Sequence, residues 1–193
     1  MRNSKLTNSC ASIKYYRMAI ILGLKLGTLI SILATVMGIT IPSISPLDGG
    51  YMILIFGISS MLLLWLFTHD LAHLIVGMTT GVRFNNYYFG LSNVTKLKYL
   101  IPDRLKFLFL VLGLRINKKD STADKRGFAI MYLAGPLASM IFPILVPVIF
   151  ILRNADYYIT LFLLAISLTN FGFSLLFSSK VGCIYKARRT LMK

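Results

Sequence analysis

The sequence predicts an all-α membrane protein with about four transmembrane helices and a small cytoplasmic β or interfacial insertion between the second helix and the third. Of its 193 residues, 56% are hydrophobic and only 14% are charged. The mean hydropathy is +0.75, and the apolar residues occur in runs long enough to cross a bilayer. Almost all of the 21 lysines and arginines lie outside these runs. This composition excludes a soluble nucleic-acid-binding domain, in which the charge would cover a polar surface.

Four apolar segments predict the four spans. Each is at or above the roughly 20 residues that a helix needs to cross a hydrocarbon core of about 30 Å. They cover residues 18 to about 40, 51 to about 78, 128 to 152 and 157 to 177. Basic residues precede the first segment, as they would in a secretory signal, but Lys25 interrupts it and no small-residue cleavage site ends it. We therefore expect a retained helix and a single integral membrane domain over the whole chain.

The positive charges predict the orientation of the chain. Ten of the 21 lysines and arginines lie in residues 83–126, five lie at or before Lys25, five lie in residues 180–193, and none lies in residues 42–50. Short cytoplasmic segments of membrane proteins collect lysine and arginine. We therefore expect a multi-pass protein of the cell membrane with both termini and the long middle connection in the cytoplasm. Its expected surroundings are the lipid bilayer, and no nucleic acid is expected as a partner.

The middle connection, residues 79–127, is too long for a simple turn. Its stretches 82–89 and 107–114 are rich in apolar, β-branched and aromatic residues, and glycine, asparagine and proline residues punctuate them. This pattern predicts a small sheet or hairpin against the cytoplasmic face of the bundle. The alternative is a basic surface segment whose apolar side chains lie among the lipid headgroups.

The residues that carry chemistry lie near the cytoplasmic end of the second span. His69 and His73 are the only histidines of the chain, and Asp70 lies between them. Residues four apart on a helix share one face, so both imidazoles can reach a single ion. Ionisable side chains inside a span are costly unless they face the protein interior, so this cluster indicates a function. Hydrogen bonding between helices is the alternative interpretation of the pair.

Residues 69–73, His-Asp-Leu-Ala-His, resemble the His-Glu-x-x-His motif of zinc metalloproteases, with aspartate in place of glutamate. Seven residues later comes Gly-Val-Arg-Phe at 81–84, and residues 134–139 read Ala-Gly-Pro-Leu-Ala-Ser. In this order the three segments resemble the site-2 protease family of intramembrane metalloproteases. That family has a glycine-valine turn after its motif helix and an alanine-glycine-proline-leucine-alanine-asparagine signature in its next core helix. The resemblance extends from about residue 50 to the C-terminus.

The resemblance implies an intramembrane zinc endopeptidase that cleaves a transmembrane protein substrate in or near its membrane segment. Two neutral imidazoles and one further ligand would hold Zn²⁺, which lowers the pKa of a bound water toward about 7. Asp70 is the candidate for the general base beside the first histidine. Its side chain is one methylene shorter than that of glutamate, which moves the carboxylate by about 1.5 Å. A misplacement on the scale of 1 Å can cost about a hundredfold in rate.

Cys183 is the preferred third ligand. The family's ligand is an aspartate in a late leucine-aspartate-glycine segment, but the segment of that type here, residues 47–49, precedes the histidines. The 21 residues from Asp48 to His69 span about 30 Å if helical, so we interpret Asp48 as a turn and cap residue. Cys183 follows the fourth span on the side of the histidines, and a thiolate binds zinc at about 2.3 Å. An inert interfacial cysteine and a loop aspartate that folds back are the alternatives.

Two other functions stay open at this level. A catalytically inactive relative could serve as a membrane scaffold or as a binder of transmembrane partners, and the missing glutamate, late aspartate and signature asparagine favour it. A basic membrane anchor that recruits anionic lipid or nucleic acid through residues 83–126 would explain the charge but not the histidines. Asn170, a single polar residue in the fourth span, is expected to hydrogen-bond a neighbouring helix or a substrate strand.

Overall fold

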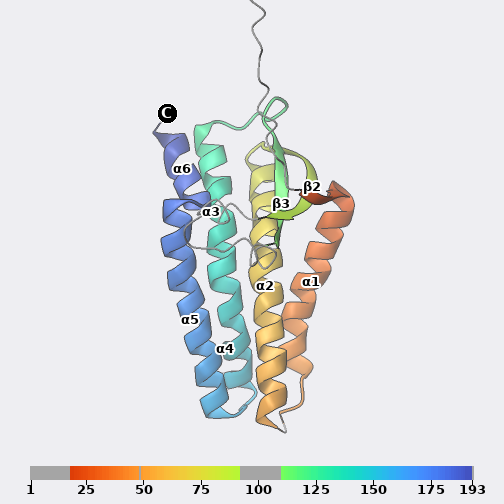
Figure 1. Ribbon diagram of the computed structural model, residues 1–193, viewed down its shortest axis with the longest axis vertical. Coiled ribbons are helices and arrows are strands. Elements are labelled where there is room, and N and C mark those ends of the chain that lie inside the picture. Colours follow the sequence, from red (N-terminus) through yellow and green to blue (C-terminus); the bar gives the residue numbers. More distant parts are fainter. Residues whose placement is uncertain (1–17, 48, 92–109, 193) are drawn as a thin grey trace, which may run out of the picture.

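The computed structural model describes residues 18–47, 49–91 and 110–192 of the chain. Long helices form an elongated bundle, and a small antiparallel sheet lies beside one end of it, called here the sheet end (Figure 1). The helices are α1 (Leu24–Ile44), α2 (Gly50–Thr79), α3 (Lys125–Ile141), α4 (Leu145–Leu152), α5 (Tyr157–Lys180) and α6 (Cys183–Leu191). The strands are β1 (Met18–Gly23), β2 (Arg83–Leu91) and β3 (Leu110–Asn117). This architecture confirms the predicted fold class.

Four helical segments of the described chain are long and apolar enough to cross a membrane. The third of them, Lys125–Leu152, consists of α3 and α4 joined by the 3-10 turn η3 (Phe142–Ile144). In an 18-residue apolar window of this span, 44% of the window is buried inside the protein. The corresponding share is 28% for α1 and for α2 and 17% for α5, so this span is the most enclosed of the four. Large apolar side chains cover the outer surface of the bundle, as expected for contact with lipid tails. The chain is therefore a multi-pass membrane protein.

The structure corrects the start of the first span. The sequence predicted a helix from residue 18, whereas residues 18–23 form β1 and α1 begins at Leu24. β1 pairs antiparallel with β2, with Ile20 opposite Phe89 and Gly23 opposite Asn86. An apolar run of six residues suits a buried helix and a strand equally well, so periodicity could not separate the two. Residues 18–23 form a strand because they pair with the backbone edge of β2, and this pairing satisfies N–H and C=O groups of both strands. The other spans begin and end within a few residues of the predicted bounds.

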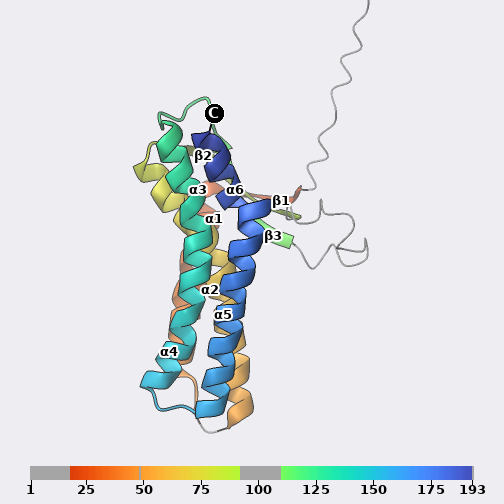
Figure 2. The ribbon, with the colours of Figure 1, turned by 90° about the vertical axis from the view of Figure 1, so that its left-hand side faces the viewer.

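β2 and β3 overlap the stretches 82–89 and 107–114 predicted for the middle connection and extend two or three residues beyond them. β2 is the central strand of the order β1-β2-β3. The turn between α2 and β2 fixes the sheet relative to the bundle. Gly81 has φ +85°, a conformation that suits glycine, and a Cβ there would lie 2.6 Å from Thr122 Oγ1. The N–H of Val82 donates to the carbonyl of Gly77, which closes this turn. These contacts connect the sheet to the end of α2, and Figure 2 shows the strands projecting sideways from that end of the bundle.

The half of the bundle away from the sheet contains a dry core. Its buried members come from α2, α4 and α5, and they are Ile53, Met61, Leu64, Val146, Phe150 and Leu163. At the same end, Nη1 of Arg153 donates to the carbonyls of Pro42 and Ser45, both at 2.8 Å. This arginine was a lone positive charge between two predicted spans, and it binds the last carbonyls of α1. Packing and this clamp keep the helices together far from the histidines.

The orientation of the bundle in the membrane stays a prediction, and cysteine labelling tests it. In a variant with Cys10 and Cys183 replaced by alanine, Thr122→Cys at the sheet end should not react with an impermeant maleimide added outside intact cells. Ser43→Cys is the matched control because Ser43 is also exposed and lies at the opposite end of the bundle. It should react several-fold faster, since residues 42–50 lack basic residues and are expected outside. The opposite labelling pattern would reverse the orientation.

Candidate metal centre

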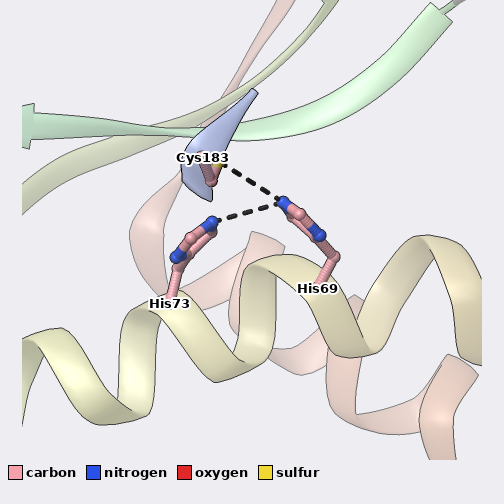
Figure 3. Close-up of side chains that lie close together, drawn as sticks. All are labelled: His69, His73 and Cys183. Atoms are coloured by element: carbon pink, nitrogen blue, oxygen red, sulfur yellow. Dashed lines mark hydrogen bonds between the residues drawn. The ribbon is translucent and has the colours of Figure 1, made fainter. Parts of the chain in front are cut away.

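His69 and His73 lie one turn apart on α2 at the sheet end, and their rings face each other (Figure 3). Their Nε2 atoms are 3.2 Å apart, and the ring planes make an angle of 86°. Two nitrogens bound at 2.0 to 2.1 Å from one tetrahedral zinc ion lie about 3.3 Å apart. The pair therefore already has the separation that a shared ion requires.

The other ring nitrogens show which face of each imidazole is available. Nδ1 of His73 lies 2.6 Å from the carbonyl oxygen of Met131, which can only accept, so Nδ1 donates. Nδ1 of His69 lies 3.3 Å from Oγ of Ser139, whose own proton goes to the carbonyl of Pro136. In neutral rings both Nε2 atoms then carry a lone pair. Two lone pairs that face each other at this distance repel, and a cation between them removes the repulsion.

Cys183 supplies a third donor atom. Its Sγ lies 3.9 Å from Nε2 of His69, and the ligand atoms of His69, His73 and Cys183 all lie within 4.8 Å of one another (Figure 3). Around a tetrahedral zinc ion, a sulfur and a nitrogen ligand lie about 3.6 Å apart. Burial raises the pKa of the Cys183 thiol, and the nearby ammonium of Lys186 opposes this shift. A bound dication would favour the thiolate far more strongly than either effect.

The turn between α5 and α6 brings Cys183 to the histidines. Gly182 precedes α6, and a Cβ at this position would lie 2.7 Å from Cα of Ser178. The Oγ of Ser178 accepts from the N–H of Ile184, which ties the start of α6 to the end of α5. A side chain at position 182 would widen this turn and move the thiol. The cysteine predicted from its place after the fourth span therefore lies beside both histidines.

α3 closes the site from the side of the glycine-proline segment. Gly135 faces the ring of His73 so closely that an added Cβ would overlap Nε2, Cδ2 and Cε1. Glycine is therefore required for α3 to approach α2 at this level. From α5, Nδ2 of Asn170 donates to the carbonyl of Ser139 at 3.2 Å. The expectation that Asn170 bonds a neighbouring helix is confirmed, and this contact supports the serine beside His69.

Asp70 is buried beside the ligand group without being part of it. Its side chain is 4% exposed, and within the part of the chain that the structure describes its Oδ2 has no hydrogen-bond partner. Buried polar atoms are almost always satisfied, so such an atom needs an explanation. Asp48, interpreted as a cap of the second span, lies outside the described residues.

A cavity of about 360 Å³ opens onto His69, Asp70, His73 and Cys183. The sheet forms one wall and the helices form the others, and most of the lining is apolar. The large lining side chains include Trp65, Phe84, Tyr88, Leu112, Phe173 and Phe177. Sequence reasoning missed Tyr132 and Lys186, which also line the cavity. The position of Lys186, three residues after Cys183, was the signal that could have revealed it, because these positions share a helix face.

Comparison of the chain with protein-family models, with curated proteins and with solved structures finds no match. The resemblance to the site-2 protease family therefore stays a prediction. The donor set itself fits a metal ion. Two imidazoles and a thiol converge from two elements, each imidazole has a partner on its far nitrogen, and the fourth side opens into the cavity.

Metal analysis of the purified protein tests this centre. After exposure to zinc and removal of excess metal, the native chain should retain about one equivalent, and His73→Ala or Cys183→Ser should weaken binding by more than roughly 100-fold. Cys183→Asp should keep the metal because a carboxylate replaces the thiolate. Ser179→Ala is the matched control, since Ser179 is exposed and bonds only the carbonyl of Leu176. A native chain without metal under these conditions would contradict the centre.

Proposed function

We propose that the chain is an intramembrane zinc endopeptidase that hydrolyses a peptide bond in or near a transmembrane segment of another protein. The observation that carries the proposal is the facing pair of Nε2 atoms with Cys183 beside them and a cavity on the fourth side. Structural zinc sites have four protein ligands, whereas catalytic sites have three and an open position. A donor set of three that opens into a cavity favours catalysis.

His69, His73 and Cys183 would hold the ion. Asp70 would accept a proton from the attacking water and donate it to the leaving nitrogen. Zinc in such a site supplies Lewis acidity toward water and toward the scissile carbonyl. Asp70 has a buried carboxylate oxygen without a partner and lines the cavity, so it can accept the proton that the attacking water loses. The same proton then goes to the leaving nitrogen as the C–N bond breaks. The second proton of the water stays on the new carboxyl group, so the products are a carboxylic acid and an amine, and Asp70 returns to its starting state.

The surroundings of the cavity support a membrane-embedded substrate. The histidines lie on a membrane-spanning helix, and aromatic and aliphatic side chains of α2, α5 and the sheet form the walls. An apolar cavity of this kind accepts the side chains of a transmembrane segment and excludes bulk water. We further propose a location in the cell membrane with both termini in the cytoplasm, which places the active site near the cytoplasmic face.

The shorter side chain at position 70 favours a second candidate. With aspartate where the family's motif has glutamate, a relative that keeps the metal but has lost catalysis would serve as a scaffold or as a binder of transmembrane partners. The metal centre is common to both candidates, so metal content cannot separate them. Proton transfer through Asp70 is the step in which they differ.

Variants of Asp70 separate the two candidates. Zinc-loaded protein in liposomes is incubated with a panel of single-span segments, and products are measured by mass spectrometry. Asp70→Asn should keep its zinc and lose roughly 10²- to 10⁴-fold in rate, because an amide cannot take the proton. A zinc chelator should stop cleavage, and Ser179→Ala should cleave like the native chain.

Two outcomes would contradict the assignment. Undiminished cleavage by Asp70→Asn would exclude Asp70 as the base. Absence of cleavage by the zinc-loaded native chain, together with cleavage of the same panel by Asp70→Glu, would favour the inactive relative, since the longer side chain restores the carboxylate position.

A further inference from the structure

Lys186 carries a positive charge beside the three residues that could hold a metal ion. It lies on α6 three residues after Cys183 and lines the same cavity. Its Nζ is 5.8 Å from the centre of the Tyr132 ring on α3, which directs the ammonium toward the bundle. Electrostatic interactions connect it with His69, His73 and Cys183. Lys186 is an exposed residue of α6, and its positive charge beside the ligand group opposes metal binding.

No described carboxylate neutralises this charge. The nearest candidate by location is Asp70, which lines the same cavity, but its Oδ2 has no hydrogen-bond partner in the described chain. Ser139, which also lines the cavity, donates its Oγ proton to the carbonyl of Pro136. Among the described residues, Lys186 lines the cavity without forming an ion pair with a carboxylate.

Peptide hydrolysis creates the anion that is missing. Attack of water on the scissile carbonyl converts its oxygen into an oxyanion, and the charge disappears again when the C–N bond breaks. Donors that are already in place where this charge develops lower the barrier, and losing one costs about 10²- to 10³-fold in kcat. A lysine one helical turn from a metal ligand is within reach of an oxygen that lies at the open side of the site.

We propose that Lys186 binds the oxyanion at the open side of the metal centre, so that the cavity is selective for a tetrahedral anion next to the metal. The proposal assumes the metal centre and adds the residue that recognises the reaction's transition state. Lys186 touches the reacting oxygen, whereas Tyr132 positions the ammonium through its ring. Anions that share this charge and shape, inorganic phosphate among them, should bind in the same place.

The test uses cobalt in place of zinc, because cobalt gives an absorption spectrum that reports on its ligands. The native chain, Lys186→Met, Lys186→Arg and Arg189→Met are loaded with Co²⁺ and titrated with inorganic phosphate. Lys186→Met should bind phosphate roughly 10- to 100-fold more weakly than the native chain, and Lys186→Arg should stay close to it. Arg189→Met is the matched control, since Arg189 is exposed on the same helix and does not line the cavity.

The affinity for Co²⁺ itself distinguishes recognition of an anion from a structural role. Loss of Lys186 removes a repelling charge, so Lys186→Met should bind Co²⁺ as tightly as the native chain or more tightly. Weaker cobalt binding by Lys186→Met would mean that the residue supports the fold of the site and would overturn the proposal. Equal phosphate affinity of the native chain and Lys186→Met would overturn it too. A native chain that takes up no cobalt would instead remove the metal centre and the proposed function with it.

Discussion

Two imidazole nitrogens that face each other at 3.2 Å with their lone pairs are the feature on which the sheet end of the bundle depends. In neutral rings with both Nδ1 atoms protonated, this contact is repulsive without a cation, yet several specific interactions hold it. Met131 hydrogen-bonds Nδ1 of His73, and Ser139 hydrogen-bonds Nδ1 of His69. Because Gly135 has no side chain, α3 can approach the ring of His73. Interactions of this kind are expected around a metal ligand pair, and they also link α2 to α3.

The apolar core and the candidate metal centre lie in different halves of the bundle. The dry core and the Arg153 clamp lie at the end away from the sheet, where the helices pack through aliphatic and aromatic side chains. At the sheet end, Asp70, His73 and Ser139 are buried among apolar side chains such as Tyr87 and Met131, and the cavity lies beside them. Polar groups are costly in a membrane interior, so a stable far half allows them to be held at the other end.

Much of this arrangement was predictable from local patterns. Apolar runs longer than 20 residues define the spans, and the spacing of His69 and His73 places them on one helix face. Cys183 followed from its place after the fourth span. Residues 18–23 were not predictable as a strand, because their fate depends on pairing with β2, more than 60 residues later along the chain. Lys186 shares a helix face with Cys183, but the direction of that face depends on the close turn at Gly182, which was not predicted.

α5 is the least buried of the spans, at 17%, and it leads into the helix that carries Cys183. His69 and Cys183 are 114 positions apart in the chain, so an ion shared between them acts as a cross-link that closes a very long loop. Cross-links over long loops remove many conformations from the unfolded chain. A bound metal would thus fasten the start of α6, which follows the least buried of the described spans, to α2. An ion that binds only the folded chain would then stabilise it in proportion to the metal supply.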